Sequence, residues 1–395
     1  MNKNGYFEFH NSVKILAGAG ALDKLPAELA RQGSRRPLLV GDRGVEAAGL
    51  LEIVGRAFAG CDVAFGAAFL DVPPDSGTNT VQAAADLYRE AGCDGLVAVG
   101  GGSVIDTAKA VNMLVSLGGS DPTAYMGAGA IAKPLGPFAV VPTTAGTGSE
   151  CTAVAVIRDD ERNRKLLFVS GYLLPGAAVI DPRMTLTLPP GVTAATGMDA
   201  LTHAIEASYC LGRNPLSDAY AHTAIELIAR RLPAVVKNPR DTAGRLDLAL
   251  ASTMAGIAFS NSMVGLVHSL GHAAGAICHL PHGIAMSVFL PAVLEYNLPT
   301  RAERIGELLL PLAGPERFYA AKADDRPREA IAAIRGLRDE LWQTAKLPRT
   351  LSETGRVRKE DFPAIARAAI DDASIAYNPE EADYGDCLQL LELAW

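Results

Sequence analysis

Four of the seven histidines in this chain lie within fifteen residues of one another, in one apolar stretch. They are His268, His272, His279 and His282. His268 and His272 are spaced i, i+4 on a predicted helix, His279 follows on the same face, and Pro281 ends the helix. Neutral imidazole is the commonest protein metal ligand, and buried histidines grouped in this way all need partners at once. The grouping therefore favours a metal site over core histidines bonded to backbone carbonyls.

A carboxylate and a further histidine occur at a spacing that suits the same ion. In the sequence GMDALTHAIEAS, Asp199 and His203 are spaced i, i+4 on a predicted amphipathic helix, so their side chains lie one turn apart on one face. A carboxylate combined with imidazoles suits divalent iron or zinc better than calcium, which prefers oxygen ligands. With two of the later histidines the ligands number four, which leaves a coordination position for a substrate oxygen. Such an open position is typical of a catalytic metal site.

The composition excludes several classes of protein. The net charge is −8 and no long run of lysine or arginine occurs, so nucleic acid is not an expected partner. Apolar runs are interrupted before about 18 residues, which predicts no membrane span, and the N-terminus has no signal-peptide pattern. The 6 cysteines form no CxxC pair, so neither disulfides nor a thiolate metal site is indicated. We therefore expect a cytoplasmic protein, and its 395 residues suffice for two domains.

Two loops rich in glycine and hydroxyl groups follow successive predicted strands. The strand GLVAVG runs into GGSVIDTAKAVNML, where consecutive glycines let the backbone approach a ligand and the first N–H groups of the helix can bind a phosphate. This spacing is neither the GxGxxG fingerprint nor a Walker loop. The strand beginning at Pro137 ends in a loop whose hydroxyls, including Ser149, can bind phosphate or ribose, with an ordinary turn as the alternative. Two such loops at one edge of a sheet favour a nucleotide site.

Strands and helices alternate in the predicted structure of the N-terminal half. An edge strand or hairpin is expected from Tyr6 to about Leu16, and a β-hairpin where TAVAVI and KLLFVS flank DDERNR. Further strands are expected at residues 37–42, 63–65 and 95–100, in the segment that begins at Pro137, and at GAAVIDP. Helices are expected at residues 20–32, from after Asp42 through Val54, at residues 78–91, and from after the glycines to Leu114. Asp42 ends a strand, where it can accept hydrogen bonds from a ribose diol or cap the next helix.

Strand patterns almost disappear after Pro182. Helices are predicted at residues 191–208, 215–235, 241–259, 262–279, 283–296, 326–346 and 359–371, with a charged loop at 314–328. The predicted boundary lies near residue 185. Residues 1–185 would form an α/β, Rossmann-like dinucleotide-binding domain with a parallel sheet, and residues 186–395 an all-α domain for metal and substrate.

These motifs together resemble the iron-containing, metal-dependent alcohol dehydrogenase family, which has a dehydroquinate-synthase-like fold. The resemblance covers almost the whole chain. It rests on GGGSVIDTAKA, VPTTAGTGSE, residues 173–182, GMDALTHAIEA, AFSNSMVGLVHSLGHAAGAICHLPHG and the late NPEEA. The chain departs from the family pattern at Asp75-Ser76, where Asn-Pro is frequent, and at Gly271 and Ala273, where many members have Ala and Pro.

The resemblance implies a role for individual residues. The metal ligands would be Asp199, His203, His268 and His282. The resemblance places His272 close to the metal and the nicotinamide without making it a ligand, and from that position we expect it to be the catalytic residue that relays a proton. His279 would be structural or would support a ligand. The cofactor-binding residues would be Gly101, Gly102, Ser103 and Asp106 at the pyrophosphate, Thr143, Thr144, Thr147 and Lys165 towards the nicotinamide, and Asp42 at the adenosine ribose. A carboxylate at the ribose repels a 2′-phosphate, so NAD is favoured over NADP.

The resulting hypothesis is hydride transfer between a small primary alcohol, bound through its oxygen to Fe²⁺ or Zn²⁺, and C4 of NAD. The ligand types do not distinguish iron from zinc. The alternatives on the same scaffold are a polyol dehydrogenase, a maleylacetate-type reductase, and a lyase resembling dehydroquinate synthase; the lyase is disfavoured because no basic cluster surrounds the histidines. A non-catalytic nucleotide-binding protein is the alternative from another class. The family and an N-terminal strand available for pairing suggest a homo-oligomer, a dimer or larger.

Overall fold

The computed structural model of the chain describes residues 6–162 and 164–395. It divides into two compact units. One contains residues 10–187, and the other contains residues 188–395 together with the described residues 6–9. The N-terminal segment joins the second unit through Phe9, whose ring stacks on Tyr220 with centroids 5.9 Å apart.

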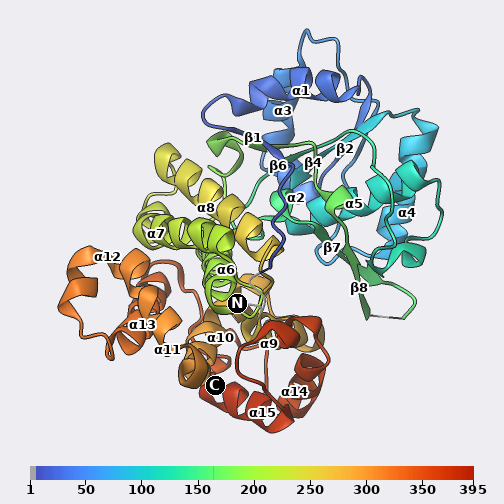
Figure 1. Ribbon diagram of the computed structural model, residues 1–395. Helices are drawn as coiled ribbons and strands as arrows, with labels where there is room; N and C mark the ends of the chain where they lie inside the picture. Colours follow the sequence, from blue (N-terminus) through green and yellow to red (C-terminus); the bar gives the residue numbers. More distant parts are fainter. Residues whose placement is uncertain (1–5, 163) are drawn as a thin grey trace. The chain divides into compact units, whose positions relative to one another are not determined.

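The unit of residues 10–187 is built on a six-stranded parallel sheet in the order β1-β9-β6-β4-β2-β3 (Figure 1). These strands are β1 (Lys14–Ala17), β2 (Pro37–Val40), β3 (Ala67–Phe69), β4 (Gly95–Gly100), β6 (Phe138–Pro142) and β9 (Ala177–Ile180). The helices are α1 (Leu25–Gln32), α2 (Arg43–Ala47), α3 (Leu50–Phe58), α4 (Thr78–Glu90) and α5 (Gly102–Leu117). The predicted α/β class with a parallel sheet is confirmed.

Both faces of this sheet are buried, as the uninterrupted apolar sequences of the central strands require. Along β4, Leu96 and Ala98 pack into a core shared with α4 and α5. Val97 and Val99 point to the opposite face and pack with α1 and α3. Because the side chains of successive strand residues point to opposite faces of the sheet, β4 contributes to both cores. Its C-terminal end leads directly into the glycine-rich turn and α5.

A small second sheet in this unit has the order β5-β8-β7, with β5 (Gly127–Ala128), β7 (Val154–Asp159) and β8 (Arg164–Val169). Strands β7 and β8 are antiparallel, so the predicted hairpin is confirmed. Two other strand predictions are wrong in position. The first strand covers only Lys14–Ala17 and pairs in parallel with β9. The third lies at Ala67–Phe69, where the chain pairs with β2, and not at the predicted residues 63–65.

Glu28 on α1 ties the edge strand β1 to that helix. Its carboxylate accepts a hydrogen bond from Lys14 Nζ at 2.6 Å and one from Arg31 Nε at 3.1 Å. The hydrogen bond to Arg31 is the largest cause that lowers the pKa of Glu28 from 4.5 to about 2, and Lys14 contributes in the same direction. A carboxylate whose pKa is lowered by folding stabilises the folded protein at any pH above its pKa in the unfolded chain. This stabilisation is lost as the pH falls through its pKa in the folded protein.

We therefore expect Glu28→Gln to lower the free energy of unfolding by about 1–3 kcal/mol at neutral pH. The difference from wild type should shrink as the pH falls from 4.5 to about 2, where the wild-type carboxylate becomes protonated. Urea unfolding at a series of pH values measures this difference in unfolding free energy, and Glu226→Gln, which changes an exposed acid, is the control. A loss of unfolding free energy that has the same size at all these pH values would contradict the stabilising role of the ionised Glu28 carboxylate.

The second unit consists of helices throughout its described part. They are α6 (Pro190–Tyr209), α7 (Pro215–Lys237), α8 (Thr242–Ser260), α9 (Leu266–Cys278), α10 (His282–Tyr296), α11 (Leu298–Glu307), α12 (Leu309–Ala320), α13 (Arg326–Ala345), α14 (Phe362–Ile370) and α15 (Tyr384–Leu393). The predicted all-helical character is confirmed. The predicted loop at 314–328 is wrong, because α12 continues across a break at Gly314, whose φ is 84°, as far as Ala320. Helices α11 and α15, and the part of α12 at residues 309–313, were not predicted.

None of the helices in the described parts of the chain has both the length and the apolar character that crossing a membrane requires.

Candidate metal centre

Three helices of the second unit bring Asp199, His203, His268 and His282 together. Each offers one ligand atom, and these atoms all lie within 4.8 Å of one another. Asp199 and His203 stand one turn apart on α6, as their spacing predicts, and His268 lies in the first turn of α9. The first three are buried, and the side chain of His282 is 40% exposed.

The turn between α9 and α10 explains how two histidines fourteen residues apart reach one point. Helix α9 ends at Cys278 and is followed by His279, which adopts the left-handed conformation with φ 52°; α10 then begins at His282 after Pro281. The next residue must be glycine, because a Cβ at Gly283 would lie 2.3 Å from the carbonyl oxygen of Ala195 on α6. This close approach of α10 to α6 places His282 beside Asp199. His279 itself is exposed, and it does not belong to the cluster.

The donor atoms of the cluster have the pattern of a site built for a cation. His282 Nε2 lies 3.3 Å from Asp199 Oδ1, and His203 Nδ1 lies 3.9 Å from the same oxygen. Asp199 Oδ1, His203 Nδ1 and His268 Nε2 are buried atoms that have no hydrogen-bond partner among the described residues. Buried polar atoms are normally paired, so several unpaired lone pairs that face one point fit a divalent metal ion.

The protonation states of the cluster also suit a metal. Burial alone would raise the pKa of Asp199, but the neighbouring His203, His282 and His268 outweigh burial and hold its pKa below the ordinary range. Burial lowers the pKa of His203 to about 3 and that of His268 well below its usual value. Near neutral pH, Asp199 is therefore a carboxylate, and His203 and His268 are neutral imidazoles, which are the forms that coordinate metals.

Two acidic residues that the sequence reasoning missed hold histidines of this group. Glu206 on α6 is buried and pairs with Nδ1 of His268. Asp372, just before the 3-10 helix at Ala373–Tyr377, accepts a hydrogen bond from His272 Nδ1 at 2.9 Å. A signal for Glu206 was present, because it follows His203 by three residues on the same face of the helix. Asp372 lies 100 residues beyond its partner, and no local pattern connects the two.

His272 lies beside the cluster without contributing to it. Its ring centroid is 5.4 Å from that of His282 and 5.7 Å from that of His268. Its side chain is 35% exposed, more than that of His268 at 3%. A half-exposed imidazole next to a candidate metal centre is placed to exchange protons with solvent, and the predicted catalytic role of His272 stays a prediction.

The predicted cofactor residues lie in the other unit, where the structure joins their two loops. Gly101 is the N-cap of α5 and Gly102 is its first residue, and a Cβ on Gly102 would lie 2.8 Å from Cγ2 of Thr147. A Cβ on Gly101 would lie 3.2 Å from Oγ1 of Thr144. Thr143 N–H donates to the carbonyl of Gly100 at 3.0 Å. The glycine-rich turn and the threonine loop therefore form one continuous surface at the N-terminus of a 16-residue helix.

The buried Lys109 and the partly buried Asp106, both on α5, form the foundation of this surface. The Asp106 carboxylate accepts from Ser149 Oγ at 2.6 Å and from Val156 N–H at 2.9 Å. Lys109 Nζ donates to the carbonyls of Thr152 and Val154 at 2.9 and 2.7 Å. Burial lowers the pKa of Lys109 to about 8. Both Asp106 oxygens thus bond within the protein, and a contact with a pyrophosphate stays a prediction.

Lys109→Met is expected to loosen this foundation. It leaves two buried carbonyls and the Ser149 hydroxyl without a cationic donor, which should cost about 3 kcal/mol or more of unfolding free energy and weaken NAD⁺ binding. Urea unfolding and fluorescence titration with NADH measure the two effects. The exposed Lys237→Met is the matched control, and wild-type values for Lys109→Met would refute the role.

Asp42 and Lys165 are also placed by local contacts. Asp42 caps α2 by accepting from Val45 N–H at 2.8 Å through one carboxylate oxygen, so the capping alternative is realised. Lys165 Nζ lies 3.1 Å from Asp75 Oδ1, and Asp75 N–H donates to Ser103 Oγ at 3.3 Å. Lys165 is therefore next to the glycine-rich turn, and its contact with the nicotinamide half stays a prediction.

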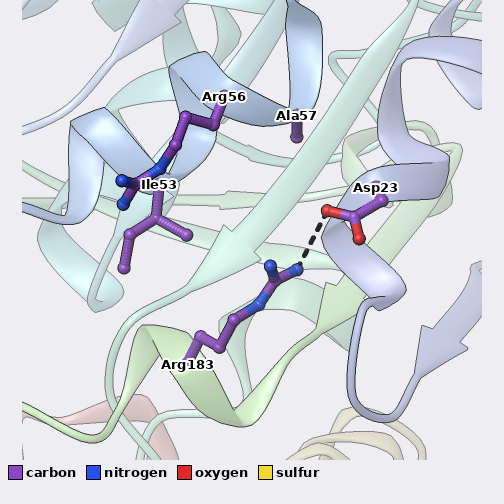
Figure 2. A pocket seen from close by; sticks show the side chains of 5 residues that line it. All are labelled: Asp23, Ile53, Arg56, Ala57 and Arg183. Carbon is purple, nitrogen blue, oxygen red and sulfur yellow. Dashed lines mark hydrogen bonds and ion pairs between the residues drawn. The ribbon is translucent and has the colours of Figure 1, made fainter.

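A separate hollow of about 490 Å³ in this unit is lined by Asp23, Ile53, Arg56, Ala57 and Arg183 (Figure 2). Arg183 forms ion pairs with Asp23 at 3.1 Å and with Asp181 at 2.7 Å. Its charge is balanced by these acids. The lining described for this hollow includes none of the predicted site residues.

Comparisons with known proteins agree over almost the whole chain. The iron-containing alcohol dehydrogenase model matches residues 12–182, and the C-terminal model of the Fe-containing alcohol dehydrogenase family matches residues 193–395. The NAD-dependent methanol dehydrogenase of Bacillus methanolicus is 36% identical over 379 residues, with 95% of this chain and 97% of that protein covered. The lactaldehyde reductase of Escherichia coli K12 is 35% identical, with 96% and 97% covered. A crystal structure of a 1,3-propanediol oxidoreductase superposes with a TM-score of 0.94 at 32% identity, covering 99% of this chain and 100% of that one.

Proposed function

This chain belongs to the iron-containing alcohol dehydrogenase family, and from that premise we propose that it transfers hydride between a small primary alcohol or its aldehyde and NAD(H) at a metal centre. The observation that carries the proposal is the convergence of Asp199, His203, His268 and His282, with unpaired buried donor atoms. Similarity to NAD-dependent methanol dehydrogenase and to lactaldehyde reductase supports this class of substrate.

The four residues would hold a divalent iron, with zinc as the alternative, and leave a position for the substrate oxygen. When bound, such an ion supplies Lewis acidity that lowers the pKa of an alcohol hydroxyl and polarises an aldehyde carbonyl. His272 would accept the proton that the alcohol releases. Asp372 holds Nδ1 of His272 at 2.9 Å, so the other ring nitrogen is left to take that proton.

The glycine-rich turn would bind the dinucleotide. Gly101, Gly102 and Ser103 offer backbone N–H groups and a hydroxyl at the start of α5 for the pyrophosphate, with Asp106 beneath them. Thr143, Thr144, Thr147 and Lys165 would contact the nicotinamide half, and Asp42 the adenosine ribose. The carboxylate of Asp42 favours NAD over NADP by charge repulsion of a 2′-phosphate.

We further propose that residues 1–185 serve as the dinucleotide domain and residues 186–395 as the metal and substrate domain of a cytoplasmic homo-oligomer. The edge strand β1 has one side available for pairing, which supports assembly. Small diols and hydroxyaldehydes are the second candidate substrates, because two of the similar proteins are named for lactaldehyde and 1,3-propanediol.

The test is NADH oxidation by the metal-loaded protein with a panel of short aldehydes, lactaldehyde and hydroxypropionaldehyde, repeated with NADPH. We expect turnover of at least one of these aldehydes, faster with NADH than with NADPH. A metal-loaded protein that binds NADH but reduces no aldehyde of the panel would refute the proposed reaction.

A further inference from the structure

Glu206 is a fully buried carboxylate at the edge of the candidate metal centre. It lies one turn after His203 on α6, and its relative exposure is 0%. One oxygen, Oε1, accepts a hydrogen bond from Val267 N–H at 2.9 Å, and the other, Oε2, pairs with Nδ1 of His268. Burying a carboxylate costs free energy unless its oxygens are paired with hydrogen-bond donors. A buried glutamate at this position therefore indicates a specific functional or structural role.

The pairing determines which nitrogen of His268 faces the metal centre. A carboxylate accepts, so Nδ1 of His268 donates its proton to Glu206 and Nε2 retains the free lone pair. Nε2 is buried and has no hydrogen-bond partner among the described residues. The ring also stacks against His203, with centroids 4.6 Å apart. Both contacts fix the ring with its lone pair among the other three donors.

We propose that Glu206 is a positioning residue of the metal centre, which fixes the tautomer and ring orientation of His268 and strengthens it as a ligand. The inference rests on the proposed function and deepens it. Carboxylates behind metal-binding histidines act in this way, and their loss typically lowers metal affinity about 10–100-fold.

The competing role for Glu206 is purely structural, because its bond to Val267 N–H also caps the start of α9. The chain contains a matched control for that role. Asn378 accepts from Leu266 N–H through Oδ1 at 3.4 Å, so it caps the same helix start. Its other side-chain bonds go to Asn297 and to the carbonyl of Glu380. Asn378→Ala should therefore weaken the fold without altering His268.

The experiment strips the metal from wild type, Glu206→Gln and Asn378→Ala, and titrates each anaerobically with Fe²⁺ and with Zn²⁺ against a chromophoric chelator. Thermal unfolding of the metal-free proteins records stability separately. We expect the dissociation constant to rise about 10–100-fold in Glu206→Gln and to stay close to wild type in Asn378→Ala. If Glu206→Gln does not fold, Glu206→Asp, which retains the charge but withdraws it from the ring, should show the same loss of affinity.

The outcomes separate this inference from the function beneath it. Wild-type affinity in the folded Glu206 variant, or an equal loss in Asn378→Ala, would overturn the positioning role while the metal centre stands. Absence of ion binding by the wild type would overturn the proposed function and this inference with it.

Discussion

Asp199→Asn is expected to abolish metal binding and turnover together. Asn is nearly the same shape as Asp, so the packing of α6 is kept, but the only carboxylate among the four donors is lost. Asp199 Oδ1 is buried and has no hydrogen-bond partner among the described residues, so its negative charge is available to bind a cation that neutral imidazoles alone would hold less strongly. We expect the variant to purify without stoichiometric metal and kcat/KM to fall by at least about 10³-fold.

Metal analysis of the anaerobically purified variant and the NADH-oxidation assay measure these effects. Glu226→Gln, which changes an exposed acid on α7, is the control for the loss of one negative charge. If Asp199→Asn kept its metal and lost activity only a few-fold, Asp199 would not be a ligand.

His272→Gln is expected to separate chemistry from metal binding. His272 stacks beside His282 and bonds to Asp372, yet it lies outside the group of four converging donors. Removing a general acid–base typically costs about 10²–10⁴-fold in rate, so kcat should fall by that amount while the metal content stays at the wild-type value. Asp372→Asn, which keeps the imidazole but loosens its orientation, should cost less.

Steady-state kinetics and metal analysis of the same preparations test this pair. Loss of the metal in His272→Gln would show that the residue is a ligand after all. Unchanged kcat in both variants would exclude His272 from proton transfer.

The sequence predicted those parts of the site that depend on local spacing. Asp199 and His203 share a helix face because an α-helix repeats every 3.6 residues. The glycines at the start of α5 predicted a turn where a ligand can approach the backbone closely, because they carry no side chain. The spacing predicted that two of the later histidines converge with Asp199 and His203, but only the family resemblance singled out His268 and His282 for this convergence. Its physical cause is the left-handed turn at His279 and the close contact of Gly283 with Ala195, which no periodicity reveals.

The errors occur where the structure depends on contacts or backbone geometry that the local sequence does not show. The strand expected at residues 63–65 is apolar, yet the chain pairs with β2 only from Ala67 onwards. Gly314 and Pro315 read as a loop, but the helix resumes after a single non-helical residue. Glu206 could have been found from its position one turn after His203 on the same helix face, whereas Asp372 lies 100 residues from His272 and gives no local sign of that partner.

The most direct test of the account is a metal titration of metal-free wild-type protein, followed by NADH oxidation with the best aldehyde of the panel. The account predicts that activity is absent at the start, rises in proportion to added Fe²⁺ or Zn²⁺, and stops rising at about one equivalent per chain. Full activity in protein shown by elemental analysis to contain no metal would contradict it.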